Sequence, residues 1–215
     1  ATLKLPRDDV QANTQSVQHA REILADVRSR FPDIRFELTG SSMLSNSFSE
    51  AATRDLQTLT PGMYLVLALT VWLLIRSISG TITTLLVVGL SAAAAMGFVM
   101  GWMGVKLTPP SSGAPTIILT VAVADSIHIL VTALVAMHKG MTKHEAIVES
   151  IRVNWQPVFL TSLTTAIGFA SLNFSDAPPF RDLGNTAAVG ALVAWVLSIS
   201  FLPALMAILP VTAKG

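Results

Sequence analysis

Hydrophobic and polar residues divide the chain into a mixed N-terminal part and a long, mostly apolar remainder. In residues 14–31 the apolar positions step by three and four, which predicts an amphipathic helix. Residues 34–38 then alternate apolar with polar side chains, which predicts a half-buried strand. With the short apolar segment at residues 2–5, this pattern predicts a β-α-β unit over residues 1–48.

Such a unit is too small to bury a full core. We therefore expect it to be part of a larger α+β subdomain whose other half precedes residue 1, the alternative being an independent mini-domain. The opening residues resemble the middle of a domain, so we expect the chain to be a fragment of a longer protein.

Five apolar runs follow a predicted helical connector at residues 49–60. A helix rises 1.5 Å per residue, so about 20 apolar residues cross a bilayer. We expect a membrane all-α helical bundle within residues 61–210, with a small N-terminal α+β (β-α-β) piece. The predicted transmembrane helices cover residues 61–76, 81–102, 114–137, 157–174 and 185–209.

Residues 142–154, between the third and fourth runs, have a different pattern. Apolar residues favour one face of this segment and charged residues occupy the rest. This pattern predicts a short amphipathic helix that lies at the membrane interface. Trp155, which follows it, is typical of an interfacial anchor.

Composition supports a membrane protein. Hydrophobic residues make up 52% of the 215 residues and charged residues only 13%, whereas about a quarter of the residues of soluble domains are charged. The net charge is +1 without a basic cluster, so we expect no nucleic-acid partner. The absence of cysteine excludes disulfides and thiol chemistry. We also expect no enzymatic activity, cofactor or metal site, because the sequence has no nucleophile motif, phosphate-binding loop or metal-ligand cluster.

Basic residues in the short loops predict the orientation. Five spans place the N-terminal part and the C-terminus on opposite sides, and the more basic side is cytoplasmic. We therefore expect the N-terminal unit to be periplasmic and the C-terminus cytoplasmic in a bacterial inner membrane. The more basic side receives Arg76, Lys139, Lys143, Arg152 and Lys214, and the other side Lys106 and Arg181.

The candidate functional residues lie in the middle of the third span. No other acidic residue occurs between Asp55 and Glu145, so Asp125 is a lone carboxyl group near the bilayer midplane. Such a group is costly in lipid and is a functional hypothesis by default. His128 is three residues further along, on the same helical face, and we expect the two to form a proton relay. The alternatives are that Asp125 only hydrogen-bonds a neighbouring helix and that His128 is a polar core residue.

Other polar and small residues are weaker candidates. Thr132, Thr161, Thr164 and Thr165 could line a polar path for protons or water, or could bond to carbonyl groups of their own helices. Gly97 and Gly101 form a G-x-x-x-G pattern, which favours close helix packing within the bundle over a dimer contact.

Three motifs give the chain a family resemblance. They are Asp125-Ser126-Ile127-His128, the run from Gln156-Pro157-Val158 to Gly168-Phe169, and Phe201-Leu202-Pro203-Ala204-Leu205. In this arrangement the chain resembles the RND superfamily, and within it the MMPL-type and Patched-like exporters of hydrophobic molecules. The resemblance implies that the spans are helices two to six of one six-helix half, with proton-relay chemistry at Asp125. Many relatives have an Asp-Tyr-Ser-Ile-His order, so the carboxylate here is one place later, about 100° around the helix.

The resemblance implies a function. We expect part of a proton-motive-force-driven exporter of hydrophobic, lipidic or amphiphilic molecules. The alternatives are a sterol- or lipid-sensing module without transport, and an RND-type auxiliary of protein translocation. The expected partners are membrane lipids, a hydrophobic or lipidic substrate and the remainder of the same polypeptide, and a homo-oligomer is left open.

Overall fold

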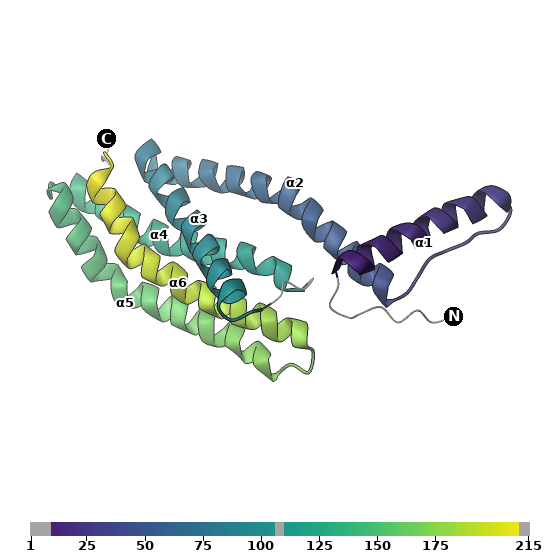
Figure 1. The fold of residues 1–215 in the computed structure, drawn as a ribbon. Coiled ribbons are helices and arrows are strands. Elements are labelled where there is room, and N and C mark those ends of the chain that lie inside the picture. The colour runs from purple at the N-terminus through teal and green to yellow at the C-terminus, as the bar shows by residue number, and fades with distance from the viewer. Residues whose placement is uncertain (1–9, 106–109, 211–215) are drawn as a thin grey trace. The chain divides into compact units, whose positions relative to one another are not determined.

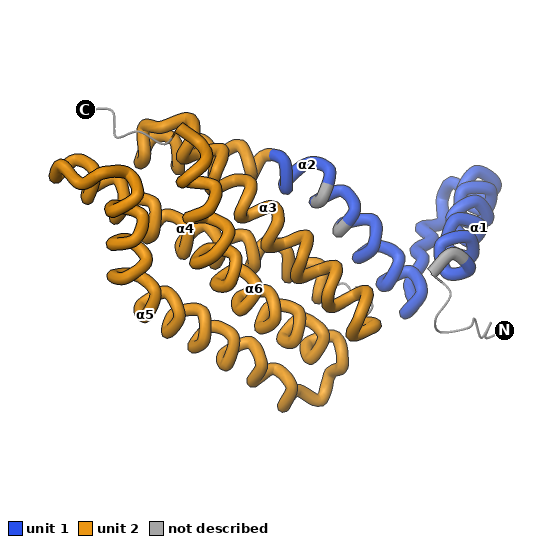
Figure 2. Tube along the Cα trace, turned by 60° about the vertical axis from the view of Figure 1, so that its left-hand side comes forward, with its two compact units in different colours: residues 1–61 blue, residues 62–215 orange. Residues whose placement is uncertain are grey.

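The structure is a computed structural model that describes residues 10–105 and 110–210. Helices make up its regular secondary structure, and none of the described residues forms a strand (Figure 1). The chain divides into two compact units, residues 1–61 and 62–215 (Figure 2). In chain order the elements are α1 (Val10–Arg30), α2 (Ser41–Ile75), α3 (Ile78–Gly101), η1 (Pro110–Gly113), α4 (Ala114–His138), α5 (Lys143–Ala170), η2 (Ser171–Phe174) and α6 (Pro178–Ile208).

The first unit contains α1 and the N-terminal part of α2. The Arg21 guanidinium donates two hydrogen bonds to the Glu50 carboxylate, at 2.7 and 3.0 Å. Asn46 also donates to Glu50 at 2.7 Å and is buried, as is Val17. The Arg21–Glu50 ion pair therefore connects the two helices, and Asn46 bonds to the same carboxylate from within α2.

The predicted strand at residues 34–38 is wrong. Residues 35–39 have no regular secondary structure and belong to the connection between α1 and α2. The Phe36 carbonyl accepts hydrogen bonds from the Arg28 guanidinium, and the Phe36 ring contacts Phe31. The Arg28 side chain of α1 thus bonds to a backbone carbonyl of this segment. No described residue supplies a partner strand, without which the alternating pattern cannot form a sheet. The other predicted strand, at residues 2–5, lies outside the described residues.

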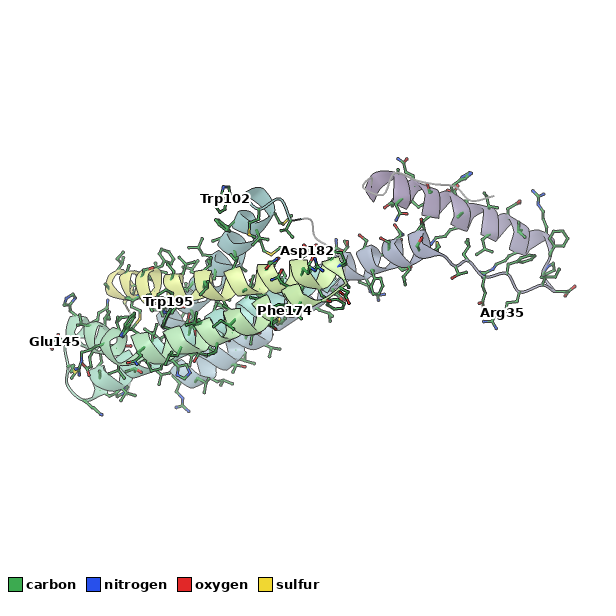
Figure 3. The ribbon with its side chains drawn as sticks, turned by 90° about the horizontal axis from the view of Figure 1, so that it is seen from below. Arg35, Trp102, Glu145, Phe174, Asp182 and Trp195 are labelled. Atoms are coloured by element: carbon green, nitrogen blue, oxygen red, sulfur yellow. The ribbon has the colours of Figure 1, made fainter. Side chains whose placement is uncertain are left out.

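The second unit is a helical bundle. Within residues 10–105 and 110–210, five helical segments are long and apolar enough to cross a membrane: Ser41–Ile75, Ile78–Gly101, Ser111–His138, Lys143–Phe174 and Pro178–Ile208. Each predicted span overlaps one of them. Many large apolar side chains point outward, as expected for a lipid-facing surface. Figure 3 labels two of the exposed aromatic residues, Trp102 and Phe174, at helix ends.

The core of the bundle surrounds α4, which packs against α3, α5 and α6. One cluster joins Ile129, Leu130 and Leu134 of α4 to Leu202 and Met206 of α6, and α2, α3 and α5 also contribute to it. A second cluster joins α4 to α3 and α6. One side of the centre of α4 is therefore buried against other helices, and the side that carries His128 is exposed.

The sequence predicted a break between an interfacial helix at 142–154 and a span at 157–174, and this is wrong. The structure has one helix, α5, that begins at a capping box formed by Thr142 and Glu145 and continues through Pro157. Proline removes one backbone hydrogen bond, but neighbouring helices let membrane helices tolerate it. The polar and the apolar half of α5 therefore form one continuous helix.

Candidate functional site

The candidate site is built around Asp125 in the middle of α4. Its side chain is only 1% exposed. The Ser162 hydroxyl on α5 donates a 3.0 Å hydrogen bond to one carboxylate oxygen, Oδ2. Within the described residues no cationic group bonds to Asp125. The site is thus a buried carboxyl group with a neutral partner.

Two further polar contacts connect α4 and α5. Asn154 donates to the Thr132 hydroxyl at 2.8 Å, and Ser150 donates to the Ile129 carbonyl. Ser150, Asn154 and Ser162 are all buried, and their spacings of four and eight residues place them on one face of α5. This inner face therefore fixes α5 against α4 and holds Ser162 beside Asp125. The sequence did not single out Ser150 or Asn154, and it indicated Ser162 only as one of several hydroxyl residues in this span.

His128 does not join Asp125 in this structure. Its side chain is exposed, whereas Asp125 is buried, and no hydrogen bond or ion pair connects the two among the residues described. Residues three apart are offset by about 60° around a helix, so one can point inward while the other points outward. The relay that the sequence predicts for this pair stays a prediction.

The predicted polar path is spread over two environments. Thr132 is half-buried and accepts the hydrogen bond from Asn154. Thr161 and Thr164 are exposed, and both donate to carbonyl groups of their own helix. Thr165 is half-buried. The structure does not gather these four hydroxyl groups around Asp125.

The structure also does not bring Gly97 and Gly101 against a neighbouring helix. A Cβ atom at either position would meet no atom within 4 Å. Close helix contact occurs instead at Gly190 of α6, where a Cβ would collide with the Ile118 side chain of α4. The sequence analysis did not select Gly190.

Two buried hydroxyl groups belong to α4 and α6. Ser126 and Ser198 are buried, and neither hydroxyl has a hydrogen-bond partner in the described part of the chain. Gly190 of α6 packs on Ile118 of α4, and Leu202 and Leu130 belong to one apolar cluster, so the two helices contact each other. Ser126 directly follows Asp125 in α4.

This arrangement is suited to handling a proton. A charged carboxylate without a cationic partner is costly in an apolar surrounding, and a bound proton removes that cost. The nearby serine hydroxyls can donate or accept hydrogen bonds in either state. Within the described residues no group of three or more His, Cys, Asp or Glu side chains could hold a metal ion.

Comparisons with known proteins give the family. The chain is 23% identical over 194 residues to the probable transport protein MmpL2 of Mycobacterium tuberculosis, covering 88% of this chain and 20% of that protein. It is 25% identical over 202 residues to the probable transport protein MmpL1 of the same organism, covering 92% and 21%. It is also 25% identical over 162 residues to the nickel and cobalt resistance protein CnrA of Cupriavidus metallidurans, covering 74% and 15%.

The chain thus spans only about a fifth of the two mycobacterial proteins and less of the third. The model of the MMPL family matches residues 2–212, nearly the whole chain. The match confirms the resemblance that the three sequence motifs indicated. This multi-pass membrane chain belongs to the MMPL family of the RND superfamily.

Proposed function

We propose that the chain is part of a transporter that exports hydrophobic, lipidic or amphiphilic molecules across the bacterial inner membrane, driven by the proton-motive force. Two relatives are named as transport proteins, which supports a transport role for the longer protein to which this chain corresponds. The substrate class follows from the resemblance to exporters of hydrophobic molecules.

The observation that carries the proposal is the burial of Asp125 between helices with Ser162 as its partner. Moving a charge into or out of an apolar interior changes the free energy by several kcal/mol. A change of about 5.5 kcal/mol takes a two-state equilibrium from 1:99 to 99:1. Protonation of Asp125 is therefore the step that we assign to the switch between two packings of α4 and α5.

Asp125 is the primary relay residue in this proposal. His128 is exposed on α4, where it is open to a partner helix from the remainder of the polypeptide. The distribution of basic residues in the loops supports a periplasmic N-terminal unit and a cytoplasmic C-terminus. In this orientation the proton enters from the periplasm and leaves to the cytoplasm.

The test uses the full native polypeptide reconstituted in vesicles. Asp125→Asn keeps the shape of the side chain and its hydrogen bond to Ser162 but cannot carry a proton. We expect efflux of a fluorescent lipid analogue driven by a pH gradient to fall to the level of empty vesicles. Asp176→Asn, a matched change at an exposed carboxylate in the loop before α6, should leave efflux unchanged.

Other outcomes would favour the alternatives. Gradient-driven efflux that persists in Asp125→Asn contradicts the assigned role. A lipid sensor would bind and respond to its lipid with Asn at this position. An auxiliary of protein translocation would show a secretion defect without any loss of lipid efflux.

A further inference from the structure

An open groove lies on the surface of the bundle between the membrane-spanning part of α2 and the start of α3. Its volume is about 350 Å³. Leu65, Leu69 and Trp72 line it on α2, and Ile78 and Ile82 line it on α3. These side chains are exposed, Leu65 by 68% and Ile78 by 70%. The groove is therefore an apolar hollow within two segments that are long and apolar enough to cross the membrane.

A basic residue lies at one end of this groove. Arg76 and Ser77 form the short turn between α2 and α3, and the Arg76 amide donates to the Trp72 carbonyl at 2.7 Å. Arg76 has a φ of 51°, a left-handed conformation that suits a tight turn. Its side chain is exposed and belongs to none of the ion pairs within the described residues. Arg76 is thus an exposed basic residue in the turn between Trp72 and Ile78, both of which line the groove, and it has no ion pair within the described residues.

We propose that this groove binds a phospholipid of the surrounding membrane that has an anionic headgroup. One acyl chain lies between α2 and α3 along Trp72, and the phosphate binds Arg76. Arginine presents a planar set of N–H donors that matches phosphate oxygens. The N-terminal end of α3 is at the same turn, and its helix dipole adds partial positive charge. The lipid is a ligand here and not cargo, so the inference does not depend on transport.

The lining of the groove favours an acyl chain. All of its lining side chains except Thr81 are apolar, and the groove is open along the surface of the two helices. A flexible hydrocarbon chain can enter it and bury apolar surface on both helices.

Trp72 provides the test, because brominated acyl chains quench a tryptophan that they contact. The full native polypeptide is placed in bilayers that contain brominated phosphatidylglycerol or brominated phosphatidylcholine. The contribution of Trp72 is the difference between the wild type and Trp72→Phe. We expect phosphatidylglycerol to be preferred roughly fivefold, the value of one basic residue near the membrane surface.

Three variants separate the parts of the site. Arg76→Gln should remove the headgroup preference, and Arg76→Lys should retain it. Lys139→Gln, which changes an exposed basic residue at the turn after α4, should leave the preference unchanged and controls for general surface charge. Ala68→Phe, at a position that lines the groove, should reduce quenching by both lipids.

Three results would overturn the inference. The first is that neither brominated lipid quenches Trp72, because then protein covers the groove. The second is equal quenching of the wild type by both lipids, because then no headgroup is recognised. The third is that Lys139→Gln lowers the preference as much as Arg76→Gln. Size-exclusion chromatography and helix content by circular dichroism verify that each variant is folded.

Discussion

The two faces of α5 use the same kinds of side chain in opposite ways. On the inner face, Ser150, Asn154 and Ser162 are buried and donate hydrogen bonds to α4. On the outer face, Thr161 and Thr164 are exposed and donate to carbonyl groups of α5 itself. A hydroxyl group in a helix can bond to a carbonyl group of its own helix. The direction in which the side chain points decides whether the hydroxyl group bonds to its own helix or to a neighbouring helix.

This difference identifies which polar residues of the bundle determine its structure. A donor that bonds to its own helix can be replaced at low cost, because the replacement leaves no buried partner unsatisfied. A donor that bonds to another helix leaves an acceptor behind when it is removed. Stability measurements on inner-face and outer-face variants can therefore confirm or contradict the comparison.

We expect the largest loss of stability for a substitution on α6, at a position that packs against another helix. Gly190→Ala places a Cβ against Ile118, and overpacking of this kind costs about 1–3 kcal/mol of unfolding free energy. Gly97→Ala places a Cβ where no atom lies within 4 Å, so it should cause no loss. Reversible unfolding in mixed micelles measures both. Equal losses for the two variants would mean that Gly190 does not pack as described.

A smaller effect is expected at the partner of Asp125. Ser162→Ala removes the hydrogen bond to the carboxylate and should cost about 1 kcal/mol, the range measured for hydrogen bonds between membrane helices. Thr164→Ala, on the outer face, should cost less than half as much. The same unfolding measurement compares the two variants. A Ser162 variant as stable as the wild type would remove the distinction between the faces.

Asn154→Leu tests a second residue of the inner face of α5, which precedes Ser162 in the helix. It removes donors to the Thr132 hydroxyl and to the Ser150 carbonyl, and we expect a loss of about 0.6 kcal/mol. Gln156→Leu is the control, since Gln156 is exposed. If the Gln156 variant lost more stability than the Asn154 variant, the assignment of inner and outer faces would be wrong.

We expect the smallest loss of stability at the charged N-terminal end of α5. The Lys143 ammonium group donates to the Ala207 and Leu209 carbonyls, both at 2.8 Å, and so caps the C-terminus of α6. Lys143→Met should cost about 0.5 kcal/mol, the value of a cation at a helix C-terminus. Lys139→Met, at an exposed lysine, should have no measurable effect on the unfolding free energy. High salt should reduce the difference between the two variants.

The sequence was sufficient to predict the helices of the bundle, because long apolar runs leave few alternatives in a membrane. It was misleading at residues 34–38, where alternation indicates a strand only if a partner strand is present. It was also misleading at Pro157, which is typical of a helix start but lies inside α5. In both cases the outcome depended on neighbours that a local pattern does not contain.

The site was predictable only in part. Asp125 stood out because a lone carboxyl group in an apolar run is unusual whatever surrounds it. Its partner did not, because Ser162 and the threonines near it have similar side chains and differ in the direction they point. The spacing of three residues also predicted that His128 lies beside Asp125 on one helical face. In the structure His128 is exposed and Asp125 is buried.

The continuity of α5 has a mechanical consequence. The residues from Thr142, which caps α5, to Ser162, which contacts Asp125, form one continuous helix. Pro157 lies within it and lacks an amide proton, so one backbone hydrogen bond of the helix is missing there. A displacement at the Thr142 cap can therefore be carried along α5 to the Ser162 hydroxyl, which contacts Asp125 of α4. The charged turn before α5 and the buried carboxyl group of α4 are thus connected through one helix.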